Sequence, residues 1–234
     1  MQHRLLPWHM LMMRTSSNVI PKKSLSFGVG GLWKQYQPPG IARRLTMIDH
    51  QWPDLLHSWS RHILATSDYR DYLPEEVIDE QNLWIGYPGA SEEQIAQAEA
   101  RLKTRLPESY REFLKVSNGW PTGGPYVARI LPVEEIEWVS ARKRNWLEGW
   151  KLGVRLGSGR DDPSVFREML GFDIGLLESG LEISNEDVGI YLLIPGLKSA
   201  DGEWEAWCFE GETGAMRYSS FWDLMQDESD ILQR

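Results

Sequence analysis

Histidine, the side chain that most often transfers protons near neutral pH, is confined to the start of this chain. All five histidines lie before residue 63: His3, His9, His50, His57 and His62. A Ser-His-Asp triad or a histidine general acid built from later residues alone is therefore excluded. His57 and His62 are separated by about 140° around a helix, unlike the i, i+4 pair of a zinc helix. The pattern predicts no histidine catalysis and no zinc site.

Other residue types that could support catalysis or ligand binding are weakly placed. Cys208, the only cysteine, lies in the apolar run Trp207-Cys208-Phe209, which is typical of a buried small hydrophobe rather than a nucleophile. The glycine-rich stretches 28–31 and 157–160 lack the remaining residues of a dinucleotide fingerprint or a phosphate loop. The pairs Asp161-Asp162 and Glu186-Asp187 lack the alternating oxygen ligands of a calcium loop. We therefore expect no enzyme activity, metal or cofactor, with carboxylate-only catalysis as the alternative left open.

Charge divides the 234 residues unevenly. Residues 1–46 contain seven basic side chains and no acidic one, so residues 47–234 hold 18 basic against 34 acidic residues, an excess of 16 negative charges. An acidic body disfavours nucleic acid, because phosphate binding requires clustered Lys and Arg. It favours a basic protein partner that a complementary field can steer, although the charge could serve solubility alone.

Composition also divides the chain into three parts. Residues 1–46 lack a sustained hydrophobic period, and we expect them to be disordered, a transit-like segment, or an upstream extension preceding a true start at Met47. Residues 47–86 form a helical lead-in, and residues 87–230 form the main domain. No apolar run approaches the ~18 residues that span a bilayer. Together with the single cysteine, this favours a cytoplasmic protein that does not contact membranes.

Hydrophobic spacing predicts the elements of these parts. A helical period indicates helices over 52–64, around 74–76, over 91–102, over 107–117, over 137–150 and from Ser220 onward. Ser91 and Gln94 have the spacing of a capping box, and Asn118-Gly119 has the composition of a helix end. A period of two indicates strands over 126–131, 181–184, 189–194, 204–210 and 215–218, with a hairpin turn at 211–214. Helices followed by antiparallel strands predict an α+β domain with a closing C-terminal helix.

The segment from Pro88 to Gly119 closely resembles the signature of the SUKH superfamily. The resemblance rests on the Pro-Gly turn, the acidic helix start and Ile95 and Leu102, together with Glu99, Leu106, Pro107, Tyr110, Phe113, Leu114, Asn118 and Gly119. Residues 220–224 also resemble the closing helix of that family, whereas 137–180 is longer than the family needs. The resemblance implies a helix pair packed on a strongly bent antiparallel sheet, and it marks these residues as structural.

The resemblance also implies a function in protein binding without catalysis. Bacterial members often neutralise toxins as immunity proteins, and the fungal Smi/Knr members are regulators. We therefore expect an immunity protein that binds a basic toxin domain, with a regulatory scaffold or adaptor as the alternative and the oligomeric state left open. Tryptophan is favoured at interface hot spots, and the residues we expect to bind the partner are Trp120 and Trp204, taken as exposed, with Asp161, Asp162, Glu186 and Asp187.

Overall fold

The structure is a computed structural model, and it describes residues 50–66, 70–71, 73–122, 129–158, 165, 167–168, 171–185, 189–210 and 214–232. Its helices are α1 (Trp52–Ala65), η3 (Glu75–Val77), α3 (Glu92–Leu102), α4 (Glu108–Val116), α5 (Val139–Arg142), α6 (Arg144–Ser158), α8 (Ile174–Glu178) and α9 (Phe221–Leu232). Its strands are β1 (Glu137–Trp138), β2 (Leu181–Glu182), β3 (Gly189–Lys198), β4 (Trp204–Glu210) and β5 (Gly214–Tyr218). The predicted α+β class is confirmed, and so is the closing helix.

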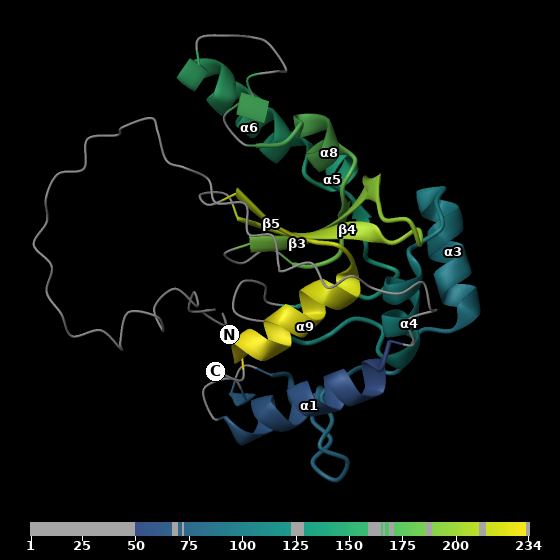
Figure 1. Ribbon diagram of the computed structural model, residues 1–234. Helices are drawn as coiled ribbons and strands as arrows, with labels where there is room; N and C mark the ends of the chain where they lie inside the picture. Colours follow the sequence, from purple (N-terminus) through teal and green to yellow (C-terminus); the bar gives the residue numbers. More distant parts are fainter. Residues whose placement is uncertain are drawn as a thin grey trace, which may run out of the picture.

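The five strands form one antiparallel sheet in the order β1-β2-β3-β4-β5. Its centre is the long β3–β4 pair, whose register shifts between Ile194 and Lys198, an irregularity of the kind that bends a strand. Helices cover both faces of the sheet, with α9, α4 and α1 on one side and α5, α6 and α8 on the other (Figure 1).

Alternation along β3 and β4 explains why both faces are covered. Successive side chains of a strand point to opposite faces, and here both sets are apolar. Tyr191 and Cys208 belong to the core shared with α1, α3, α4 and α9. Leu192 and Trp207 belong to a second core shared with α5, α6 and α8. A sheet with two apolar faces requires two helical layers to remove it from water.

One predicted element differs from the structure. Residues 137–150 were expected to form a helix, and most of them do, but the first two form a strand and the helix is interrupted once. Glu137 and Trp138 pair with β2 as strand β1, and the helical stretch that follows is divided at Lys143, which has non-helical backbone angles. Helical spacing of Trp138, Arg142, Trp146 and Trp150 does not reveal these breaks, because pairing with β2 depends on residues some 45 positions away.

Two further predictions lie partly outside the described residues. The expected strand over 126–131 is described only from Arg129, and there Ile130 forms isolated bridges with Trp120 and Ser184. The expected turn at 211–214 is described only at Gly214. No helix among the described residues combines the length and apolar character needed to cross a bilayer.

Aromatic rings fill the core between α1, α4 and α9. The ring of Phe113 is fully buried and lies with its centroid 5.3 Å from Trp52, 6.0 Å from Tyr110 and 5.1 Å from Phe221. These contacts join the lead-in helix, the second motif helix and the closing helix. The centre of this core is therefore made by residues far apart in the sequence.

Truncation of that ring should be costly. Phe113→Ala should lower the free energy of unfolding by ~3–5 kcal/mol, because it removes buried apolar area and leaves a cavity. Leu156→Ala is the matched control, since Leu156 is 75% exposed, and it should change stability by less than ~0.5 kcal/mol. Urea denaturation followed by tryptophan fluorescence measures both. A loss below 1 kcal/mol for Phe113→Ala would contradict the packing described here.

Candidate protein-binding surface

The helix pair α3–α4 is built by reciprocal polar contacts around its connection. Ser91 and Gln94 form a capping box at the start of α3, which satisfies two otherwise unpaired N–H groups. Glu99 lies near the end of α3, and its carboxylate reaches beyond the helix. It accepts the Leu106 backbone N–H at 2.8 Å and lies 2.6 Å from Arg111 of α4. Glu99 therefore ties the loop and the second helix to the first.

Helix α4 is capped from a distant part of the chain. Pro107 occupies its N-cap position and provides no side-chain acceptor. Instead the buried carboxylate of Glu203, in the loop between β3 and β4, accepts the Ser109 backbone N–H at 2.9 Å and its hydroxyl. An acidic group also suits the positive end of the helix. Sequence analysis missed Glu203, and the only local hint was the serine two residues after Pro107.

Asn118 and Gly119, which follow α4, form a bracket for the segment 129–138. The Asn118 side chain accepts the Val133 backbone N–H at 2.8 Å and donates to Glu134 at 3.0 Å. Gly119 has a φ of +92°, and a Cβ there would lie 2.8 Å from the Ile130 carbonyl oxygen. Only glycine combines that backbone angle with so close an approach. The two residues therefore fix the position of the segment.

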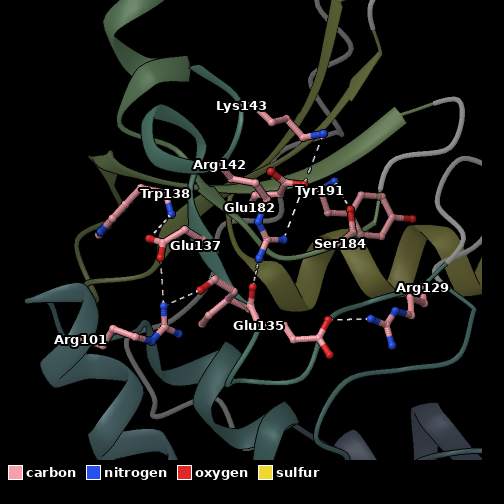
Figure 2. A network of polar contacts seen from close by, with 11 residues as sticks. Arg101, Arg129, Glu135, Glu137, Trp138, Arg142, Lys143, Glu182, Ser184 and Tyr191 are labelled. Atoms are coloured by element: carbon pink, nitrogen blue, oxygen red, sulfur yellow. Dashed lines mark hydrogen bonds and ion pairs between the residues drawn. The ribbon is translucent and has the colours of Figure 1, made fainter. Parts of the chain in front are cut away.

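A second set of contacts holds the same segment from α3 and from the sheet edge (Figure 2). Arg101 of α3 donates to the carbonyl oxygens of Val133 and Ile136 at 3.2 and 2.9 Å and pairs with Glu137 at 3.3 Å. Arg142 donates to the Glu135 carbonyl oxygen. The backbone carbonyl oxygens of three residues between 133 and 136 are thus bonded by arginine side chains, which hold the segment against the domain.

Beneath the segment, β2 carries a buried carboxylate. Glu182 is 2% exposed, with Lys143 and Arg142 at 3.6 and 3.9 Å (Figure 2). A buried charge is tolerated only when opposite charges compensate its desolvation. The last residue of α5 and the residue that links α5 to α6 supply those cations, which fixes this connection at the edge of the sheet.

The outer side of the bracketed segment is acidic. We call the exposed residues Glu76, Glu134 and Glu135 the acidic face, in which Glu135 pairs with Arg129 at 2.6 Å. The pKa of the Tyr87 hydroxyl is raised, mainly by burial; Arg129 lowers it, whereas the charges of Glu76 and Glu135 raise it further. Burial raises the pKa of Glu134, but bonds from Asn118 and Gln94 outweigh it and hold that pKa below its usual range.

Comparison with known protein families gives one match to this architecture. Residues 89–227, more than half of the chain, match the model of the SMI1 / KNR4 family (SUKH-1). The chain belongs to the SMI1 / KNR4 family. A comparison with curated proteins finds no significant match. The resemblance drawn from residues 88–119 is therefore confirmed as to family.

Within this SUKH-1 domain the two tryptophans expected at the surface are buried, and that expectation was wrong. Trp120 is 0% and Trp204 2% exposed. Trp120 stacks edge-on between Trp59 of α1 and Trp84 of the lead-in, with centroids 6.3 and 5.3 Å away. Turn residues beside a tryptophan place its backbone near the surface, but the side chain can still point inward. The acidic pairs at 161–162 and 186–187 lie outside the described residues.

One histidine of the lead-in reaches the SUKH-1 domain, which spacing did not predict. His50 Nδ1 lies 2.5 Å from a carboxylate oxygen of Glu112 on α4, and its ring lies 5.2 Å from Trp222. His57 stacks near Trp84 at 4.8 Å. His50 therefore joins the lead-in to α4 and α9, whereas His57 packs within the lead-in. Within the described part of the chain, no three His, Cys, Asp or Glu side chains gather as a metal site would require.

The described core contains one titratable cluster, between α9 and the sheet. Glu228 is fully buried. Burial raises its pKa to about 8; interaction with the Tyr191 hydroxyl lowers it, and the charges of Asp227 and Glu210 raise it. Burial likewise raises the pKa of Tyr191 and of the Cys208 thiol. A thiol with a raised pKa is a poor nucleophile, and Cys208 is buried in the core.

The protonation of Glu228 should make stability pH-dependent. Because its pKa rises from 4.5 to about 8 on folding, its contribution is fully present below pH ~4.5 and is lost as the pH rises toward ~8. Glu228→Gln should therefore gain stability relative to the parent chain by up to ~1.4 kcal/mol per pH unit across that window. Urea denaturation at several pH values measures the difference. Glu93→Gln, on the surface, is the control, and equal slopes for the parent and Glu228→Gln would contradict the burial argument.

Proposed function

We propose that this SUKH-1 protein acts by binding another protein, and that it is an immunity protein which neutralises a basic bacterial toxin. The observation that carries the proposal is the acidic face, held rigidly by the bracket of Asn118 and Gly119 and by Arg101. The family includes immunity proteins and Knr4-type regulators and is generally non-enzymatic. A rigid acidic surface binds without the entropy cost of ordering a loop.

Occlusion of the toxin's active site is the mechanism that this surface supports. An enzyme that acts on an anionic substrate lines its groove with Lys and Arg. The carboxylates of Glu76 and Glu135 would lie against such a groove in place of the substrate. Tyr87, half-buried between them, would add an aromatic contact of the kind that interfaces favour.

The net charge of the body also supports a basic partner. Residues 47–234 carry an excess of 16 negative charges, and such a field accelerates the encounter with a basic protein. Charges at the rim of an interface mainly change the association rate, whereas buried apolar anchors set the dissociation rate. Binding should therefore be fast at low salt and strongly dependent on ionic strength.

The regulatory role known for fungal Knr4-type members is the alternative. It requires protein binding too, but the bound client remains active. Capture of the native partner with the tagged full chain, followed by mass spectrometry, identifies the partner. An activity assay with and without this protein then separates inhibition from recruitment.

Charge reversal of the acidic face tests the proposal. Glu76→Lys with Glu135→Lys should slow association with the captured partner at least ~5-fold at 50 mM salt and leave dissociation nearly unchanged. Asp54→Lys with Asp230→Lys is the matched control, because it makes the same charge change at exposed residues elsewhere. Surface plasmon resonance measures both rates. In the parent chain, raising salt from ~50 to ~500 mM should slow association about tenfold. An association rate that is unchanged by both salt and charge reversal would contradict the acidic-face proposal.

A further inference from the structure

Leu83 combines two unfavourable features at one position of the lead-in. Its side chain is 43% exposed, which makes it one of three exposed large hydrophobic side chains among the described residues. Its φ is +51°, in the left-handed region, where the Cβ lies too close to the following carbonyl oxygen. Glycine, asparagine and aspartate adopt this angle more readily than a bulky residue does. Leucine therefore stands where a small polar residue would be more stable.

The other left-handed residue that is not glycine, within the described part of the chain, has a structural explanation. Lys103 is the C-cap of α3, and its backbone N–H donates to the carbonyl oxygens of Ala100 and Glu99. Helices commonly end on a left-handed residue, because it satisfies the last carbonyl groups. Leu83 lies at no helix end. Its backbone angle serves the turn, but the turn does not require leucine.

The turn that contains Leu83 is fixed by bonds at both ends. The backbones of Asp79 and Trp84 exchange two hydrogen bonds, of 2.8 and 3.0 Å. The Asp79 carboxylate also accepts the backbone N–H groups of Gln81 and Asn82, both at 3.0 Å, and the Asn82 side-chain amide at 2.7 Å. A turn held in this way cannot easily relax to relieve the angle at Leu83.

Trp84 fastens this turn to the rest of the protein. Its ring centroid lies 4.8 Å from His57 of α1 and 5.3 Å from the buried Trp120. A Cβ at Gly86 would lie 2.4 Å from the Trp84 ring, so the chain passes tightly beneath it. Leu83 is thus held in a defined position although its side chain is partly in solvent.

The same turn is continuous with the acidic face. Glu76 comes three residues before Asp79, and Tyr87 comes three residues after Trp84. Because the bridge between Asp79 and Trp84 joins the two arms, Leu83 lies within ~20 Å of Glu76 along the backbone. One side of a standard interface covers ~800 Å², a disc about 32 Å across. A single partner can therefore cover both residues.

We propose, on the basis of the function proposed above, that Leu83 anchors the basic partner by entering an apolar pocket that is bordered by Lys and Arg. Interfaces combine an apolar centre with a polar rim, and the exposed Glu75 and Glu76 on η3 supply acidic groups for such a rim. Backbone strain persists where a function requires it. A fixed turn also lowers the entropy cost of binding.

Charge argues against other occupants of this site. A second copy of the chain would bring its own Glu75 and Glu76 toward the same residues, and like charges across an interface are unfavourable. Anionic lipids would likewise repel the acidic body. A basic protein is the occupant whose charge is complementary to these residues.

Replacement of the leucine tests the anchor, using the full chain and its captured partner. Leu83→Asn should speed dissociation at least ~10-fold in surface plasmon resonance and change association less than ~2-fold, because it removes apolar contact but no charge. Leu83→Met keeps an apolar side chain and should dissociate within ~2-fold of the parent rate. Leu152→Asn is the matched control and should change neither rate, since Leu152 is exposed on α6, across the sheet from α1 (Figure 1).

Thermal unfolding gives a second readout that needs no partner. Leu83→Asn should raise the melting temperature by ~1–3 °C, because asparagine accepts the left-handed angle more readily. Leu152→Asn, in a regular helix, should not raise it. A lower melting temperature for Leu83→Asn would overturn the argument that this leucine serves binding rather than stability.

The rates also separate the anchor from the acidic-face proposal. Unchanged dissociation of Leu83→Asn, with association that still depends on salt and charge reversal, would overturn the anchor alone. Faster dissociation of Leu83→Asn, with association that depends on neither, would support the anchor and contradict the acidic face. Failure to capture any partner would contradict both.

Discussion

The contact between Gly119 and the Ile130 carbonyl oxygen determines how the two halves of this domain meet. Gly119 has a left-handed backbone angle and leaves no space for a side chain, so the chain turns sharply as it leaves α4. The Asn118 side chain then bonds Val133 and Glu134. The Leu131 backbone N–H donates to the carbonyl oxygen of Ile183, the residue that follows β2. Through these few atoms the helix pair, the segment 129–138 and the sheet edge become one unit. Without them the carboxylates of the acidic face would have no fixed position.

Local chemistry explains why much of the scaffold was predictable. The capping box at Ser91 and Gln94 and the helix end at Asn118-Gly119 depend on residues within a few positions of each other. Strand β4 was predicted with the bounds that the structure shows, 204–210, because its turn residues and apolar run are local signals. The family followed from the same short-range pattern.

Long-range contacts explain what the sequence did not reveal. Glu203 caps α4 across 94 positions, and no local pattern distinguishes it from any surface glutamate. Trp120 lies between Trp59 and Trp84 only because the lead-in folds back on the domain. Strand β1 was predicted as helix because its partner, β2, is separated from it by more than 40 residues of the sequence. The acidic face likewise combines Glu76 with Glu135, which are far apart in the sequence. Composition therefore predicted the negative charge of the body but not the position of this face.

The two helical layers have different roles in this account. The layer of α1, α4 and α9 encloses the aromatic core and the buried Glu228, and it stabilises the fold. The layer of α5, α6 and α8 covers the second apolar face of the sheet and supplies Arg142 and Lys143 to Glu182.

The most direct test of the central claim is hydrogen–deuterium exchange of the full chain with and without its captured partner. The account predicts slower amide exchange on binding in the segment 129–138 and in the lead-in from 73 to 87. Helix α9, on the other side of the aromatic core, should exchange at the same rate in both samples. Protection confined to α6 or α9, with residues 129–138 unchanged, would contradict the claim that the bracketed acidic face binds the partner.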